Sequence, residues 1–427
     1  MSKIIDKIMN FVSVLAEKLT KFKYLMAVAE TMQALLGITM IGSFACLFAF
    51  IDIPVWTKFL TKYPGVKAFF MTVQFLTLTI ISVYVILLLS YLYAEKLQIK
   101  EKLLTIPIAL AAFLLVTPVN LYSDIPTAWL GHAGLFTAMI IGFIVPRVVK
   151  LFLDKGITIK MPAGVPRVVE NTFAVLVPAF VICTVFGIIG RLMLATPYQT
   201  IHNLIYTLIQ VPMKNVGLSF PVYLFYQIIM TLFMFCGVHG TTAVTWMTPI
   251  RTAAAQEQLA AFSAGQPLPH IIVGAFENCI CVGGIGATLG LGILMFIFAK
   301  SKRYKQLSRM AIVPQIFNIG EPFLFGIPIM LNPILFMPYM GGIIINTIVV
   351  YIAVATGLCA RFTGVEIAWT VPSPIKAFLG CSVPWQGLVL CLIVLAIDMV
   401  IWYPFVKLID KQALAEEKAS EESAKEA

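Results

Sequence analysis

The stretch at residues 311–330, AIVPQIFNIGEPFLFGIPIM, decides the fold of this chain. It is as apolar as a membrane-spanning helix, yet helix breakers recur through it, at Pro314, Gly320, Pro322, Gly326 and Pro328. Proline removes a backbone donor and clashes with the preceding turn, so one straight helix cannot form here. Non-helical backbone at membrane depth is tolerated only where protein buries it or where it lines a wet cavity. The stretch therefore predicts a broken helix beside a cavity in a membrane protein.

The composition of the whole chain agrees with a bilayer environment. Of its 427 residues, 60% are hydrophobic and 12% are charged, whereas soluble domains carry about 45–50% apolar and about 25% charged residues. So little charge excludes a soluble enzyme, a nucleic-acid-binding domain and a disordered chain. The apolar runs are continuous and much longer than the alternating segments of about ten residues that build a membrane barrel, which favours helices.

The apolar runs of the chain predict the fold class. They lie at 31–51, 69–93, 103–119, 130–152, 173–195, 220–238, 271–298, 333–357 and 384–407. We expect an all-α polytopic membrane protein with about ten transmembrane helices, two re-entrant hairpins and amphipathic interfacial helices. Broken segments are expected at 239–270, 311–330 and 363–383, where polar residues, glycine or proline interrupt the apolar pattern.

Basic residues in the linkers predict the orientation. Clusters at 94–102, 147–170 and 300–309 belong on the cytoplasmic side, which places both termini in the cytoplasm, although the lysines of 52–68 argue weakly against this. The two ends of the chain have patterns of their own. We expect an amphipathic surface helix at 1–23 and a disordered tail at 411–427.

The eight cysteines are scattered through apolar stretches and are interpreted as small buried hydrophobes. Cys279 and Cys281 are the only close pair, and a gap of one residue is not a zinc-binding spacing. We therefore expect no metal site, and the sequence indicates no cofactor and no nucleic-acid partner.

A few polar side chains inside the apolar second half are candidates for a binding site, because an ionisable group in a membrane segment costs about 2.5–3.5 kcal/mol. The candidates are His239, Asn278, Asn318, Glu321 and Trp369, with Glu277 and Glu366 as weaker ones. Each has a structural alternative: a satisfied core histidine, a helix-capping amide or carboxylate, or an interfacial tryptophan. Asp398 in the last span is expected to pair with a polar group on a neighbouring helix.

A histidine, a carboxylate, amides and a tryptophan in a neutral cavity suit sugar binding. Carboxylate and imidazole accept hydrogen bonds from hydroxyl groups, and an aromatic face packs on the C–H side of a sugar ring. A cation channel needs rings of carbonyls or acids instead. A proton-coupled carrier can use the same carboxylate and histidine as a proton relay, so residue types alone do not separate these two functions.

Three segments carry a family resemblance: FCGVHG at 235–240, NIGEPFLFGIPIMLNP at 318–333 and AWTVPSPIKAFLG at 368–380. With AETMQALLGITMIGSF near the N-terminus, the chain resembles the sugar-permease (enzyme IIC) subunits of the bacterial phosphoenolpyruvate-dependent phosphotransferase system, in the lactose, cellobiose and diacetylchitobiose branch. The resemblance implies a homodimer in the bacterial inner membrane, with a dimerisation or scaffold domain at 24–218 and a substrate-binding transport domain at 219–410. It also implies inward movement of a β-linked disaccharide, which a separate enzyme IIB subunit, carrying phosphate on a cysteine, then phosphorylates.

The resemblance also implies roles for individual residues. The family's histidine and glutamate, which hold the hydroxyl that receives phosphate, fall on His239 and Glu321, its stacking tryptophan on Trp369 and its asparagine on Asn278. Two positions depart from the family pattern, Gly320 in place of asparagine and Ile285 in place of serine. The alternative is therefore a facilitator or proton-coupled sugar carrier that does not phosphorylate.

Overall fold

The computed structural model of the protein describes residues 21–50, 54–118, 125–162, 164–327, 329–330 and 332–426. The surface helix expected at 1–23 lies almost wholly outside these residues. The described part of the chain is helical, and the one β-bridge in it joins Phe362 to Cys381. The prediction of an all-α fold is confirmed.

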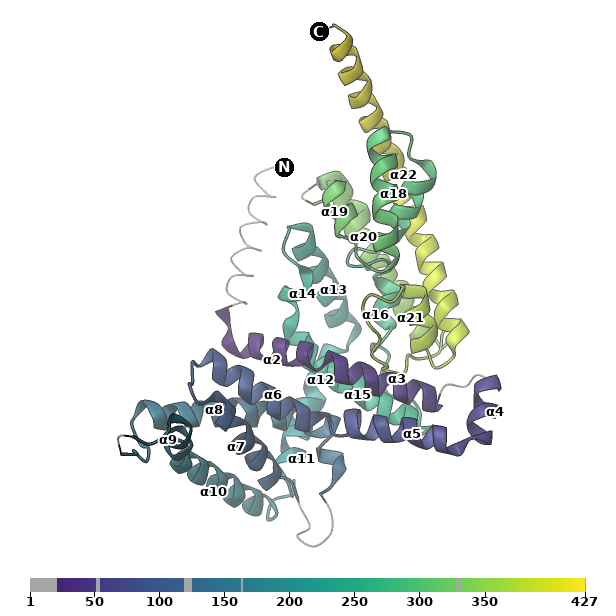
Figure 1. Cartoon of the computed structure of the whole chain (residues 1–427). Helices are drawn as coiled ribbons and strands as arrows, with labels where there is room; N and C mark the ends of the chain where they lie inside the picture. Colours follow the sequence, from purple (N-terminus) through teal and green to yellow (C-terminus); the bar gives the residue numbers. More distant parts are fainter. Residues whose placement is uncertain are drawn as a thin grey trace.

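The N-terminal half packs its longer helices into one layered group (Figure 1). Its helices are α2 (Lys23–Ala34), α3 (Leu36–Phe50), α4 (Pro54–Lys62), α5 (Pro64–Gln74), α6 (Ile81–Lys96), α7 (Lys102–Leu115), α8 (Leu135–Asp154), α9 (Arg167–Ala174) and α10 (Leu176–Met193). Here α6 packs on both α7 and α8, while α9 and α10 lie at the edge of the group. The short helices α11 (Ile201–Ile205) and α12 (Val211–Gly217) follow.

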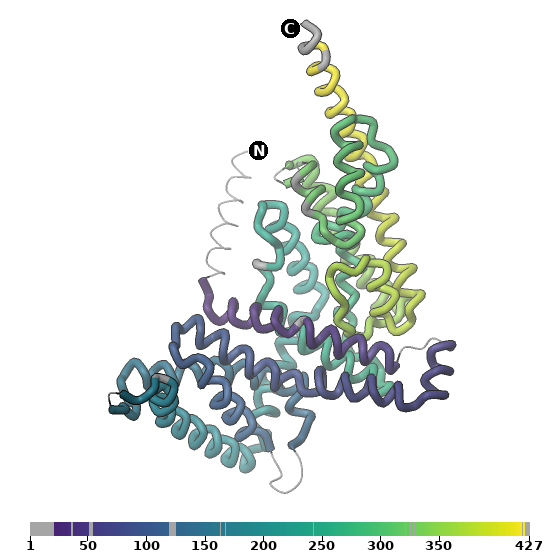
Figure 2. Tube along the Cα trace, in the orientation of Figure 1, coloured from purple at the N-terminus to yellow at the C-terminus, as the bar shows by residue number. Residues whose placement is uncertain are grey.

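Most of the C-terminal half stands beside this group, and Figure 2 shows the yellow and green parts of its path above and to the right of the purple and blue one. Its helices are α13 (Phe220–Phe235), α14 (Gly240–Ala243), α15 (Thr248–Ser263), α16 (Phe276–Ile280), α17 (Leu289–Phe298), α18 (Lys302–Ile316), α19 (Glu321–Gly326), α20 (Pro333–Ala355), α21 (Ser373–Gly380) and α22 (Pro384–Glu426). The helices α20 and α22 pack against each other, and α17, α18 and α21 pack against α22.

Long apolar helices confirm the membrane character. In the described residues four helices are long and apolar enough to span a bilayer, His132–Asp154, Val168–Met193, Pro333–Ala355 and Pro384–Ser420, and the number rises to seven if each bent pair is one span. Two of the bent pairs correspond to expected runs, such as 69–93, which the structure divides at an angle of 41° before α6. The third joins Ile201–Gly217 to the helix of the expected run 220–238.

The stretch 311–330 is broken, as its prolines and glycines predict. The helix α18 ends at Ile316, and α19 begins only at Glu321. Between them Asn318 takes a φ of +64°, a left-handed conformation that asparagine tolerates better than most residues. The side chain of Asn332 caps the N-terminus of the next helix, α20: its Oδ1 accepts from the backbone N–H of Ile334 at 3.0 Å.

The helices are also interrupted in the other two segments that were expected to be broken. After α13 the chain turns at Gly237, with a φ of +87°, and continues as the four-residue α14, a 3-10 turn and then α15. Residues 357–372 contain no helix. Within this segment the Thr363 N–H donates to Gly380 O at the end of α21, at 2.8 Å. Both 239–270 and 363–383 are therefore interrupted, as expected.

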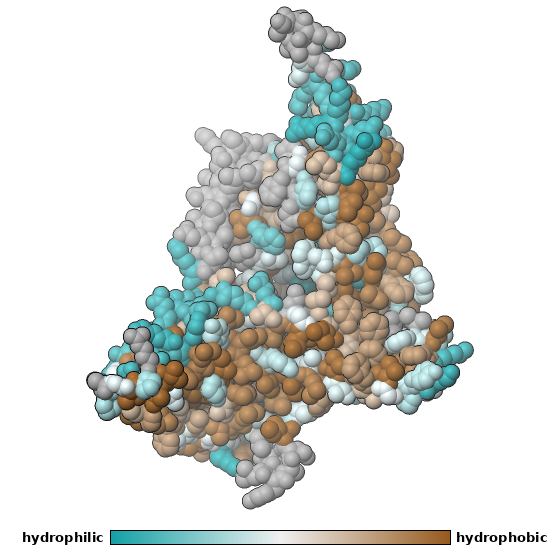
Figure 3. All heavy atoms as spheres, in the orientation of Figure 1, coloured by the Kyte–Doolittle hydropathy of each residue, from teal (hydrophilic) through white to brown (hydrophobic). Residues whose placement is uncertain are grey.

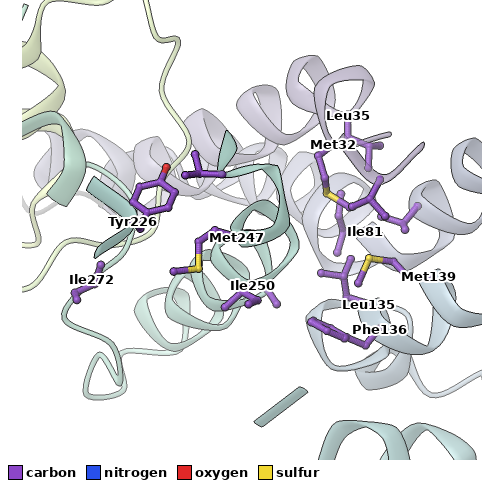
Figure 4. Packing of buried hydrophobic residues seen from close by; sticks show 14 of the residues in the cluster. Met32, Leu35, Ile81, Leu135, Phe136, Met139, Tyr226, Met247, Ile250 and Ile272 are labelled. Atoms are coloured by element: carbon purple, nitrogen blue, oxygen red, sulfur yellow. The ribbon is translucent and has the colours of Figure 1, made fainter. Parts of the chain in front are cut away.

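One buried apolar cluster joins the two halves. Figure 4 shows its members Met32, Leu35 and Ile81 from the N-terminal helices, with Met247 and Ile250 at the start of α15. The helix α15 contacts α2, α3 and α12. The core therefore crosses the expected boundary at 218/219, with α15 as the element that the two halves share.

The tail is helical rather than disordered, so the expectation for 411–427 was wrong as far as the described residues reach. Its Ala, Glu and Lys are strong helix formers, and α22 continues through them to Glu426. Asp410, just before the tail, and Glu417 within it accept hydrogen bonds from free backbone N–H groups at the start of α18. Asp410 accepts from Ser301 N–H at 3.0 Å, and Glu417 accepts from Arg303 N–H at 2.9 Å. These hydrogen bonds fasten the end of α22 to the start of α18. Figure 3 shows hydrophilic residues gathered where α18 and the end of α22 project.

Candidate functional site

Asn318 fixes the loop that carries Trp369. Its Nδ2 donates to the backbone oxygens of Trp369 at 2.8 Å and Val371 at 2.7 Å, and its Oδ1 accepts from Ser373 Oγ at 2.7 Å. The Lys376 ammonium also donates to Trp369 O, at 3.1 Å. The break after α18 therefore holds the backbone at 369–373, and the indole of Trp369 is left 58% exposed.

His239 lies at the N-terminus of α14, in the turn that follows α13. Its Nδ1 lies 2.8 Å from Thr241 Oγ1, and its ring is exposed. The backbone around it is tight, because a Cβ at Gly240 would lie 2.2 Å from Met230 O. The structure therefore does not bury His239 as a core histidine, and one edge of its ring is oriented by a threonine.

Thr241 belongs to a polar cavity of about 290 Å³ between the two halves of the protein. One wall comes from α2, α3 and α6, and the other comes from α14, α15 and the loop before Trp369. Its polar lining residues are Gln33, Thr39, Thr241, Thr245, Thr248, Arg251, Thr252, Gln256 and Glu366. The cavity is close to the lower size limit of ligand pockets, and most of its polar lining groups are hydroxyls and amides.

A charged triad next to this cavity was not predicted from the sequence. Arg251 of α15 pairs with Glu277 of α16, and its Nη1 donates to Tyr226 Oη on α13 at 2.6 Å. Tyr226 in turn donates to Glu277 Oε1 at 3.1 Å. The triad connects three elements and explains Glu277 as an ion-pair partner. Its signal was available, because Arg251 is the only lysine or arginine in the Thr- and Ala-rich stretch 239–270, which was already expected to be broken.

A second charged network holds α15 in place. Lys214 of α12, 3% exposed, pairs with Glu257, which also contacts His270 Nε2 at 2.9 Å. Burial alone would raise the pKa of Glu257, but hydrogen bonds from His270 and Lys214 outweigh it and lower that pKa to about 2. Glu257 is therefore ionised throughout the physiological pH range, and the network fastens α15 to α12.

The remaining candidates lie around these features. Asn278 is half-buried on α16, next to Glu277 of the triad. Glu321 is the first residue of α19, three residues after Asn318, and its side chain lies outside the described part of the structure. Glu366 and Thr241, the hydrogen-bond partner of His239, line one cavity, whereas Asn318 and Trp369 meet at one loop. Glu366 precedes Trp369 by three residues.

Gly320, one of the two departures from the family pattern, lies near a buried amide that also contacts the glycine-rich loop of the other departure, Ile285. Gln315 Nε2 donates to Gly283 O and to Thr288 Oγ1, each at 2.6 Å, while its Oε1 has no partner among the described residues. A Cβ at Gly320 would lie 3.3 Å from Thr288 Oγ1. Gln315 therefore supports the glycine-rich loop at a point that a side chain at position 320 would also reach.

Asp398 pairs with a polar group on a neighbouring helix, as predicted. Asn346 Nδ2 of α20 donates to Asp398 Oδ1 at 2.9 Å, and both side chains are fully buried. In the described residues no group of three or more His, Cys, Asp or Glu side chains is arranged to hold a metal ion.

Apolar helices of spanning length, broken helices and a polar cavity between them define a membrane permease, and comparison with known proteins identifies its family. A profile of the family "Phosphotransferase system, EIIC" matches residues 29–342. The oligo-beta-mannoside-specific EIIC component of Bacillus subtilis is 34% identical over 97% of this chain and 96% of its own length. A lactose-specific EIICB component of Streptococcus mutans is 34% identical over 70% of this chain and 53% of its own length.

A solved structure agrees. The IIC component of an N,N'-diacetylchitobiose-specific phosphotransferase system superposes with a TM-score of 0.89, at 33% identity over 96% of this chain and 98% of that one. The chain therefore belongs to the EIIC family, the sugar permeases of the phosphotransferase system.

Proposed function

We propose that this chain moves a β-linked disaccharide, of the cellobiose or diacetylchitobiose kind, into the cell, where a separate EIIB subunit phosphorylates it. The observation that carries the proposal is the polar cavity between the two halves, in a chain whose relatives over nearly the full length are named for β-mannoside and diacetylchitobiose. The name EIICB of the lactose relative supports a cytoplasmic EIIB partner, which that protein carries on the same chain.

The proposed arrangement in the membrane is a homodimer of protomers with about ten spans and with both termini in the cytoplasm. Residues 311–330 and 363–383 are the proposed re-entrant hairpins. Residues 24–218 form the proposed scaffold and 219–410 the proposed transport domain. Bent apolar pairs and the interrupted helices support this arrangement. The helix α15 is the proposed joint because it packs on α2, α3 and α12, while its Arg251 pairs with Glu277 of α16.

We assign a role to each of the site residues. Glu321 accepts the hydrogen bond of the sugar hydroxyl that receives phosphate, and His239 orients that hydroxyl. Trp369 stacks on the sugar ring, and Asn278 bonds a hydroxyl. Asn318 positions Trp369 rather than contacting sugar, because its amide already makes three hydrogen bonds to the 369–373 loop.

The proposed chemistry depends on placement. In phosphoryl transfer the attacking and leaving groups must be in line, and the protein contributes mainly positioning and charge stabilisation. Glu321 and His239 hold the hydroxyl at the cytoplasmic end of the site, facing the phosphocysteine of EIIB. The hydroxyl oxygen forms the new bond to phosphorus, the cysteine sulfur leaves, and Glu321 receives the hydroxyl proton. The charged product then does not return through an apolar barrier.

The proposal is tested with purified protein in vesicles, supplied with phosphorylated EIIB or with none. We expect sugar phosphate to accumulate only when phosphorylated EIIB is present. Equal accumulation of unmodified cellobiose without EIIB, with a dependence on the proton gradient, would instead establish a carrier that does not phosphorylate. The departures at Gly320 and Ile285 are the sequence features that favour this second outcome.

Asn318→Gly is expected to weaken sugar binding about tenfold, or about 1.4 kcal/mol, because the loop under Trp369 loses its three side-chain bonds. Glycine accepts the φ of +64°, so backbone strain does not contribute. The measurement is calorimetric titration with cellobiose, together with hydrogen exchange across 366–373. Ser373→Ala removes one of the three bonds and should have a smaller effect. Unchanged affinity and exchange in Asn318→Gly would refute the positioning role.

A further inference from the structure

Two buried oxygen atoms without partners lie in the centre of the C-terminal half. Asn346 Nδ2 donates to Asp398 Oδ1 at 2.9 Å and to Ile280 O at 3.0 Å, which uses both of its hydrogens. Asn346 Oδ1 and Asp398 Oδ2 have no hydrogen-bond partner among the described residues. Both side chains are 0% exposed, so bulk water does not reach either oxygen.

An ionised Asp398 cannot satisfy this arrangement. A carboxylate and an amide oxygen both only accept hydrogen bonds, so neither can serve the other. In the described part of the chain no basic side chain pairs with Asp398, and a bare charge at this depth is costly. The backbone also closes on the carboxyl group, because a Cβ at Gly290 of α17 would lie 3.0 Å from Asp398 Cβ. The titratable group that faces it from the end of α16 is the Cys281 thiol.

We propose that Asp398 permanently holds a proton on Oδ2 and donates it to Asn346 Oδ1. The carboxylic acid and the amide then form a closed neutral pair, in which each partner donates once and accepts once, and both orphan oxygens gain a partner together. The proton is taken up when the carboxyl group becomes buried, and no other bond changes. The site binds a proton and needs no metal ion.

This pair positions the sugar site. Ile280, whose carbonyl accepts the second hydrogen of Asn346, is the last residue of α16, and the same short helix carries Glu277 and Asn278. A protonated Asp398 fixes the orientation of the Asn346 amide and hence the end of α16. Asp398 is thus a positioning residue, and this consequence for sugar binding rests on the proposed function.

The protonation state is tested by infrared difference spectroscopy of wild type against Asp398→Asn in vesicles. We expect the wild type to show the carbonyl-stretch band of a protonated carboxyl group, shifted in D2O and constant from about pH 5 to pH 9, and the variant to lack it. Glu366→Gln is the matched control, and the band should survive in it. A wild type without the band, or a band that disappears as the pH is raised through neutrality, overturns the proposal.

The positioning role has a separate readout. Asp398→Asn supplies an amide N–H in place of the acid O–H, so cellobiose affinity should stay within about threefold of wild type with the same pH profile. Asp398→Leu removes both bonds and should weaken binding at least about tenfold, while Asp398→Leu with Asn346→Leu should recover folding. Loss of binding in Asp398→Asn comparable to Asp398→Leu overturns the role. If wild type binds no sugar, the proposed function fails, and the infrared result still decides the proton.

Discussion

Arg251→Ala is expected to lower the free energy of unfolding by about 3 kcal/mol, because it leaves the Glu277 carboxylate charged and without its cationic partner. The side chains of Arg251 and Glu277 are 30% and 19% exposed, which places the expected loss at the lower end for a buried pair. Arg251 also donates to Tyr226 Oη, and its guanidinium lies 5.5 Å from the Tyr226 ring centre. The change therefore loosens α13, α15 and α16 together. The measurement is thermal unfolding of the purified protein in detergent.

A double variant separates stability from binding. Arg251→Met with Glu277→Gln removes both charges and keeps similar volumes, so it should recover most of the lost stability. Arg251 lines the polar cavity, whereas Glu277 lies behind it. If Arg251 also contacts sugar, the double variant regains its unfolding temperature without regaining affinity for cellobiose. A single Arg251→Ala variant as stable as wild type would show that the ion pair contributes nothing to the fold.

The features that sequence predicted well have local causes. The break in 311–330 follows from proline and glycine in the segment itself, and the left-handed residue at the break is Asn318. The sequence predicted that Asp398 pairs with a polar group on a neighbouring helix, because a carboxyl group inside an apolar helix needs a polar partner. Which neighbour it finds depends on helix packing, which places Asn346 there, 52 residues away along the chain.

The features that sequence missed depend on tertiary contacts. Arg251 meets a carboxylate 26 residues away along the chain, and no spacing rule connects them. The composition of 411–426 suits both a solvated tail and a helix, and the choice is made by the N-terminus of α18, which supplies unpaired N–H groups to Asp410 and Glu417. The contacts of Asn318 with Trp369, Val371 and Ser373 were also missed, because these partners lie more than 50 residues away along the chain and only the fold brings them to it.

Glu321→Gln is expected to reduce the rate of sugar phosphorylation by about 100-fold or more while leaving sugar affinity within about tenfold of wild type. Glutamine keeps the shape and still accepts a hydrogen bond, but it cannot take the hydroxyl proton as the oxygen attacks phosphorus. In this proposal Glu321 takes the proton only in the transition state. The variant should therefore lose phosphorylation rate and little sugar affinity. The assay measures sugar phosphate formed in vesicles supplied with phosphorylated EIIB, beside calorimetric titration with cellobiose.

Glu366→Gln is the matched control for that experiment, because it neutralises a second carboxylate of the same region that lines the cavity. We expect it to change phosphorylation by less than about tenfold. If Glu321→Gln and Glu366→Gln lose activity equally, the effect comes from the overall charge of the cavity and not from a base at position 321. If Glu321→Gln phosphorylates at the wild-type rate, the proton leaves by another route and the assigned role is wrong. A rate loss confined to position 321, with binding retained, assigns the proton acceptor to the first residue of the helix that follows the break at 317–320.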